Sequence, residues 1–180
     1  MATYISFLRG INVGGHKLIK MDALRNMFES LKFKDVKTYV QSGNVVFSFN
    51  KTDLKELEGS ITRQIEKDFG HIVPVIVLTK EKLQKIIEQN PFSKHPEKDS
   101  SFLHFTFLAD IPKEYNQEIF EKKKQVGEEI QFNENAIYLY CPNGYGKTKL
   151  NNNFIESKLK VKATTRNWKT TNELLNIATE

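Results

Sequence analysis

Short, dense runs of apolar residues predict four strands in the first half of the chain. The first run is Tyr4–Leu8, with one polar position, and Val45–Phe49 and Pro74–Leu78 have the same character. Val36–Gln41 comes before Val45–Phe49, with a short polar turn between them. Aromatic and β-branched residues at this density are typical of buried strands. The two runs on either side of the turn are therefore predicted to form a hairpin.

Between these strands, apolar residues recur every three or four positions, which is the spacing of one helix face. This pattern predicts helices at about residues 21–32 and from Asp53 to Phe69. Glu56 follows Asp53 at the distance of a capping-box partner, and a further helix is predicted after Thr79. The resulting order, β-α-β-β-α-β with one more helix, is that of a ferredoxin-like fold.

The second half of the chain repeats this order of elements. The predicted elements are a strand over 102–108, a helix that begins near Pro112, a hairpin over 130–141, a helix over 150–159, a short extended segment over 161–168, and a terminal helix opened by Thr170 and Glu173. A polar stretch at residues 91–101 lacks apolar periodicity and separates the two halves. We therefore predict an α+β protein made of two consecutive ferredoxin-like modules, residues 1–90 and 102–180, joined by a linker at 91–101.

The composition is that of a soluble globular protein with moderate positive charge. The 180 residues include 27 basic and 22 acidic side chains, which gives a net charge of +5. This balance permits an acidic small molecule or a nucleic acid as a partner. Cys141 is the single cysteine, so an intramolecular disulfide is excluded. No apolar run approaches the roughly 18 residues of a membrane span, and we expect a cytoplasmic protein with no membrane partner.

The strongest chemical signal is the glycine-rich, basic stretch that follows the first strand. Arg9 stands at the end of a strand predicted to be central, where its side chain reaches the rim of the sheet. The three glycines that follow allow positive φ angles and a close approach of the backbone to a ligand. Unblocked N–H groups in such a turn can bind an anion. The predicted ligand-binding residues of this stretch are Arg9, Gly10, Asn12, Gly14, Gly15, His16 and Lys17.

Two further polar loops belong to the same prediction. One is the turn of the first hairpin, and the other lies at residues 143–149 in the second half, with a basic, aromatic cluster shortly before the terminal helix. The predicted ligand-binding residues here are Ser42, Asn44, Lys149, Arg166 and Asn167. We expect the three loops to form one anion-receiving surface. The alternative is that the glycines provide a flexible connection and that the basic side chains are only solvated.

The residues give no catalytic group, metal site or cofactor motif. The glycine spacing matches neither the dinucleotide fingerprint nor the phosphate loop. With four scattered histidines and one cysteine, no metal-ligand spacing occurs. Cys141 ends an apolar strand, a position typical of a small buried hydrophobic residue. Whether the protein is an enzyme is left open by the sequence.

Two other features have structural interpretations. Lys122–Lys124 follow Glu118 and Glu121 at helical spacing, which predicts a solvated face with ion pairs. Trp168 is predicted to anchor the terminal helix to the core, because a single tryptophan in a small domain is usually buried. Stacking on a nucleic-acid base is the alternative for this side chain.

Several motifs resemble a known bacterial family. FLRGINVGG at residues 7–15, KTYVQSGNVVF at 37–47, and GYGKTKL at 144–150 with ATTRNW at 163–168 are similar to the DUF1697 family of uncharacterised proteins. One small departure is Thr148, where relatives often carry serine. The resemblance implies a cytoplasmic α+β protein of the same two-part design. It implies no activity, cofactor or catalytic residue.

These observations support three hypotheses about function. The first is a protein that binds a small anionic or phosphorylated ligand in a cleft built from the glycine-rich basic loops. The second is a nucleic-acid-binding module, since ferredoxin-like sheets with exposed aromatics stack bases, and Tyr39 and Phe47 leave that option open. The third is a protein-interaction module without catalysis. The sequence does not give the oligomeric state.

Overall fold

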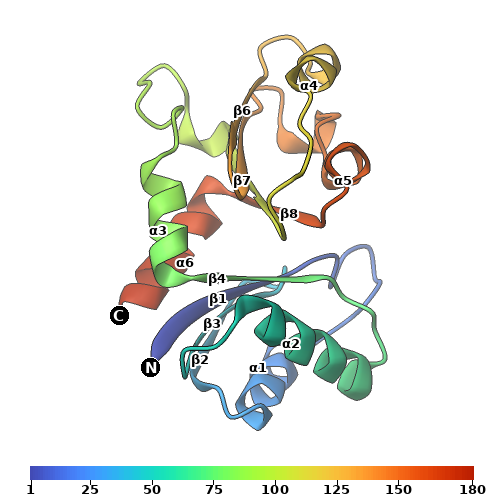
Figure 1. The fold of residues 1–180 in the computed structure, drawn as a ribbon, viewed down its shortest axis with the longest axis vertical. Helices are drawn as coiled ribbons and strands as arrows, with labels where there is room; N and C mark the ends of the chain where they lie inside the picture. Colours follow the sequence, from blue (N-terminus) through green and yellow to red (C-terminus); the bar gives the residue numbers. More distant parts are fainter. The chain divides into compact units, whose positions relative to one another are not determined.

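The structure is a computed structural model that describes residues 1–180, with two four-stranded sheets and six helices (Figure 1). The chain divides into two compact units, one of Met1–Lys85 with Glu173–Glu180 and one of Ile86–Asn172. Each unit contains one of the sheets, and all neighbouring strands are antiparallel. The predicted α+β class is therefore confirmed, and the two sheets fit two similar modules. None of the helices combines the length and apolar character that a membrane span requires.

The first unit places its opening strand in the middle of the sheet. Its elements are β1 (Ala2–Leu8), α1 (Met21–Ser30), β2 (Lys34–Tyr39), β3 (Asn44–Phe49), α2 (Leu54–Phe69), β4 (Val75–Thr79) and α3 (Lys80–Glu88). The strand order is β2-β3-β1-β4. The apolar run of β1 is explained by this position, because a central strand pairs on both edges and is covered on both faces.

Helices α1 and α2 cover one face of this sheet (Figure 1). Phe47 on β3 is fully buried there and stacks on Tyr4 at 5.5 Å and on Phe33 at 4.4 Å between ring centroids. Asp53 caps α2 as predicted. Its side chain accepts hydrogen bonds from the Lys55 N–H at 2.9 Å and the Glu56 N–H at 3.2 Å. Gly70 ends the helix with a φ of 71°.

The second unit has the same element order and the same pairing pattern. Its elements are β5 (Leu103–Leu108), α4 (Gln117–Lys123), β6 (Glu129–Asn133), β7 (Ala136–Tyr140), α5 (Asn152–Leu159), β8 (Ala163–Asn167) and the start of α6 (Trp168–Thr179), which belongs to the first unit from Glu173 on. The strand order is β6-β7-β5-β8. A core that includes Phe120, Leu139 and Ile155 lies between the sheet and helices α4 and α5. Trp168 begins α6 and stacks on Phe105 at 5.9 Å, which confirms its predicted anchoring role.

Two predicted helix starts are wrong, and asparagine caps explain both errors. Helix α4 begins at Gln117, well after Pro112, because the Asn116 side chain accepts a hydrogen bond from the Glu118 N–H at 3.1 Å. Helix α6 begins before Thr170, whose N–H donates to the Asn167 side chain at 2.8 Å. In each case an upstream asparagine side chain accepts from one of the first free N–H groups of the helix.

The bounds of the compact units differ from the predicted division at 1–90, 91–101 and 102–180. The boundaries fall inside α3 and α6, and the last eight residues belong with the first unit. An ion pair of 2.6 Å between Lys37 on β2 and Glu180 is one contact between these eight residues and the rest of the first unit. Helical spacing alone does not reveal which sheet a helix end joins. The division into modules at residues 1–90 and 102–180, with a linker at 91–101, stays a prediction.

Candidate functional site

The glycines of the first loop form a tight reversal of the chain. Gly14 and Gly15 have φ angles of 57° and 77°, and the His16 N–H donates to the Val13 carbonyl at 2.9 Å. Two consecutive residues with positive φ are the requirement of the commonest two-residue hairpin turn. The structure therefore gives the paired glycines a definite local purpose, which is to let the loop fold back on itself.

Asn12 holds this loop closed with its side-chain amide. Its Nδ2 donates to the carbonyl oxygens of Ile19 at 3.0 Å and Gln41 at 2.8 Å, and its Oδ1 accepts from the Ile19 N–H at 2.8 Å. Its φ angle of 57° is one that asparagine tolerates better than most residues. The bond to Gln41 ties the loop to the turn of the first hairpin. Predicted site residues far apart in sequence are thereby brought together within the first unit.

Charge in this loop has one sign. The titratable side chains from Arg9 to Lys20 are those of Arg9, His16, Lys17 and Lys20, and none of them is acidic. Lys17 donates from Nζ to the Ile72 carbonyl at 2.7 Å, and the Arg9 N–H donates to the Pro74 carbonyl at 3.0 Å. These bonds tie the loop to the segment that precedes β4.

The turn of the first hairpin is packed tightly against the loop. Asn44 is fully buried, and its Nδ2 donates to the Tyr39 carbonyl at 3.0 Å and to the Ser42 hydroxyl at 2.9 Å. The Gly43 carbonyl accepts from the Leu8 N–H at 2.8 Å. Ser42 itself is exposed. The two predicted polar residues therefore differ: Asn44 supports the turn from inside, and Ser42 lies at the surface.

The remaining predicted site residues belong to the second unit. Lys149 is exposed in the loop before α5. Arg166 on β8 donates from Nη1 to the Thr164 hydroxyl at 2.9 Å and to the Thr165 carbonyl at 3.0 Å, and burial lowers the pKa of its guanidinium to about 10. Asn167 caps α6. Two of the three side chains thus have structural partners.

Tyr145 links the 143–149 loop to the sheet of the second unit. Its ring stacks on His104 at 4.8 Å between centroids. Burial lowers the pKa of His104, so this imidazole is neutral at neutral pH. The Tyr145 hydroxyl also acts electrostatically on Arg166. Tyr145 of the loop and Arg166 are therefore close to one another within this unit.

The lysine run of α4 has the solvated arrangement that its spacing predicts. Lys122 pairs with Glu118 at 3.1 Å, and Lys124 pairs with Glu121 at 2.7 Å. These pairs neutralise much of the local charge. The run therefore serves as a comparison for the loop from Arg9 to Lys20, which has no acidic side chain of its own.

Cys141 is fully buried at the end of β7. Burial, together with the nearby Glu128 carboxylate, raises the pKa of its thiol to about 12. The thiol form is favoured, and the nucleophilic thiolate is scarce at neutral pH. This environment agrees with the prediction of a small buried hydrophobic residue.

We expect Cys141 to react with a disulfide reagent at about pH 8 at least about a hundredfold more slowly in the native protein than in urea-unfolded protein. Burial blocks access, and the raised pKa depletes the thiolate. The release of thionitrobenzoate measures both rates. Equal rates in the two states would show that the thiol is accessible and reactive. Because the folded-state pKa is raised, this thiol contributes stability below about pH 9 that is lost as the pH rises toward about 12.

Sequence reasoning found the basic loop but missed the role of Asn12 as its clamp. An asparagine between glycines, close to a paired-glycine turn, is a signal that was available, because asparagine both tolerates positive φ and bonds to nearby backbone. Sequence reasoning also passed over Gly59 in the middle of α2, where a glycine has no role in helix formation.

Two similar sheet units in tandem, with a clamped basic loop in the first, define a class of α+β proteins. The family model described as a protein of unknown function (DUF1697) matches residues 1–138, and the chain belongs to this family. The predicted family resemblance is therefore confirmed. A comparison with curated proteins finds no match. The conserved bacterial protein SP0830 from Streptococcus pneumoniae has a similar fold, with a TM-score of 0.74, 21% sequence identity, and 98% of each chain covered.

Proposed function

We propose that the loop from Arg9 to Lys20 binds a small anionic or phosphorylated ligand. The observation that carries the proposal is a loop of fixed shape whose titratable side chains are all basic. A fixed loop pays little conformational entropy when a ligand binds, because its backbone is already ordered. A fork-shaped guanidinium such as that of Arg9 can contact two oxygens of one anion.

The start of α1 adds to this proposal. Lys20 occupies the N-cap position, and no side chain caps the helix. The first N–H groups of an uncapped helix favour a negative group, which they bind together with the positive end of the helix dipole. The Asn12 bonds to Ile19 hold this helix start next to the loop.

The ligand-binding role of Asn12, Gly14 and Gly15 in this proposal is indirect. The Asn12 amide is fully used within the protein, and the glycines make the turn. They shape the loop, and the basic side chains contact the anion. Ser42 offers a neutral hydroxyl from the neighbouring turn. Lys149, Arg166 and Asn167 remain proposed ligand contacts in the second unit.

Phosphate affinity in two variants that each lose one positive charge tests the proposal. Lys20→Gln removes an exposed cation of the loop that has no structural hydrogen bond. We expect it to weaken inorganic phosphate binding about fivefold, the effect of losing about 1 kcal/mol of Coulombic attraction. Lys122→Gln is the matched control and is expected to leave the dissociation constant unchanged. Equal weakening in both variants would show that phosphate senses only the overall charge.

The nucleic-acid hypothesis has less support. Phe47 is fully buried between Tyr4 and Phe33, so its ring has no face on which a base could stack. We also propose that each unit is a ferredoxin-like module, on the basis of its strand order and of two helices on one sheet face. A cytoplasmic location is proposed from the single cysteine, which is buried.

A further inference from the structure

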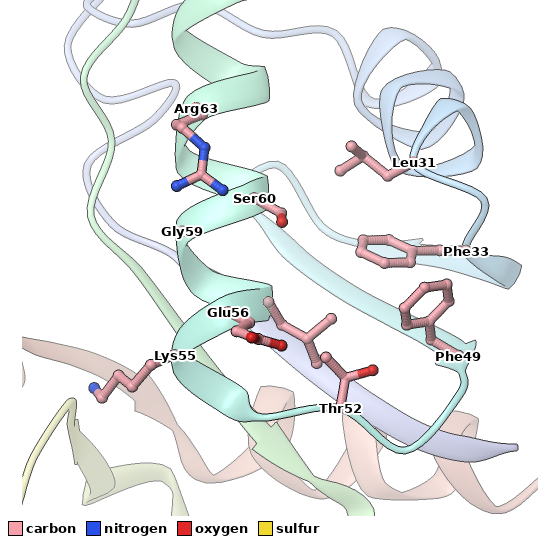
Figure 2. A pocket seen from close by; sticks show the side chains of 10 residues that line it. Leu31, Phe33, Phe49, Thr52, Lys55, Glu56, Gly59, Ser60 and Arg63 are labelled. Atoms are coloured by element: carbon pink, nitrogen blue, oxygen red, sulfur yellow. The ribbon is translucent and has the colours of Figure 1, made fainter.

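We propose that a hollow beside α2 in the first unit binds a small carboxylic acid with an apolar body. The hollow has a volume of about 400 Å³ and lies between the end of α1, the end of β3 and the first turns of α2 (Figure 2). Small-ligand pockets have volumes of about 300–1,000 Å³. No residue of the loop from Arg9 to Lys20 lines it, so this inference stands apart from the proposed function.

The wall opposite α2 is apolar and rigid. Leu31, Phe33 and Phe49 form it (Figure 2). The Phe33 ring meets Phe49 edge-on at 4.9 Å between centroids and stacks on Phe47 at 4.4 Å. Leu31 and Phe49 are partly exposed. An aromatic or aliphatic group can therefore be buried against side chains that are already fixed by the core.

The opposite side of the hollow contains a glycine where the helix does not need one. Gly59 lies in the middle of α2, a position where glycine is less favourable than alanine. A Cβ at this position would lie 3.1 Å from Nη1 of Arg63. The missing side chain thus leaves room for the Arg63 guanidinium to fold back along the helix (Figure 2).

Arg63 is the group that sets the charge of the ligand. It is exposed, and no ion pair or hydrogen bond engages its side chain. An unpaired guanidinium on the side of the hollow opposite an apolar wall is suited to a carboxylate, which it binds through two parallel hydrogen bonds. Ser60 points into the same space and offers a hydroxyl (Figure 2).

The acidic residue of the hollow fixes the orientation of the ligand. Glu56 precedes Arg63 by seven positions on α2, which is about 10 Å along the helix axis at about 1.5 Å per residue. Lys55 lines the hollow at the Glu56 end, but its Nζ is paired with Glu58 at 3.1 Å. A carboxylate is therefore attracted to the Arg63 end and kept away from the Glu56 end. The apolar body of the ligand lies between these ends, against the aromatic wall.

The test compares 3-phenylpropanoate with its neutral amide, 3-phenylpropanamide, by titration of backbone amide chemical shifts. We expect the acid to shift Phe33, Gly59 and Ser60 and to bind at least about tenfold more tightly than the amide, the effect of a charge-assisted hydrogen bond. Arg63→Gln is expected to lower the affinity for the acid to the affinity for the amide. Because Arg63 is exposed and unpaired, this variant keeps the fold. Arg25→Gln, an exposed position on α1, is the matched control and is expected to leave binding unchanged.

Three results would overturn the inference. The first is the absence of shifts around the hollow at millimolar acid. The second is equal affinity for the acid and the amide, which would mean an apolar hollow with no anion-binding end. The third is a set of shifts confined to Gly10–Lys17, which would place the acid at the proposed anion loop and leave the hollow without a ligand. Failure of the anion loop itself would instead appear in the separate titration with inorganic phosphate, as an unperturbed loop, whether or not the hollow binds the acid.

Discussion

Gly43→Ala is expected to destabilise the protein by about 3 kcal/mol, because two separate costs coincide at this position. Gly43 has a φ of 88°, and a side chain in such a conformation costs about 1–3 kcal/mol. A Cβ there would also lie 2.8 Å from both the Leu8 Cβ and the Ile11 Cδ1. Both neighbours are buried, so neither moves without disturbing the core, and overpacking costs a further about 1–3 kcal/mol. Urea unfolding followed by circular dichroism measures the loss.

Gly70→Ala separates these two costs. Gly70 has a φ of 71°, but a Cβ at this position would meet no atom within 4 Å. Only the backbone cost remains, and we expect a loss of about 1 kcal/mol. If the two variants lost the same stability, steric contact of the turn with Leu8 and Ile11 would not contribute. That result would contradict the conclusion that the turn packs tightly against the loop.

Asn12→Ala is expected to cost about 3 kcal/mol, since it leaves both backbone groups of the buried Ile19 and the Gln41 carbonyl without their partner. Each buried polar group that loses its hydrogen bond costs about 1–3 kcal/mol. Ile19 is only 2% exposed, so water does not replace the amide easily. The free energy of unfolding and the hydrogen exchange of the loop amides measure the effect.

Two further substitutions control for other causes at this position. Asn12→Gly removes the same hydrogen bonds but accepts the φ of 57° without strain, so it isolates the contribution of the amide. Asn26→Ala, at an exposed position on α1, is expected to change stability by less than about 0.5 kcal/mol. Wild-type stability in Asn12→Gly would contradict the role of Asn12 as the clamp of the loop.

The elements of the fold were predictable where local pattern and tertiary position agree. The apolar run of β1 predicted a central strand, and Asp53 marked the start of α2, because the strand's burial and the helix cap both leave a direct trace in the sequence. The starts of α4 and α6 were mistaken, since Asn116 and Asn167 compete with other residues that match capping patterns equally well.

The candidate site was predictable in its charge but not in its construction. Arg9, His16 and Lys17 could be recognised as a basic cluster after a strand. The hydrogen bond from Asn12 to Gln41 joins residues that are 29 positions apart, and spacing along the chain carries no sign of such a contact. The hollow beside α2 likewise depends on the packing of helices whose distance the sequence does not specify.

We expect the loop from Arg9 to Lys20 to bind an anion through its geometry and not merely through its charge. A titration with inorganic phosphate at moderate salt, followed by backbone amide chemical shifts, tests this most directly. Salt of about 0.1 M screens exposed charges beyond about 10 Å, so diffuse attraction is suppressed. We predict saturable shifts at Gly10, Gly14, Gly15 and His16, with Lys122–Lys124 unmoved. Shifts confined to the lysine run, with the loop glycines unmoved, would contradict it.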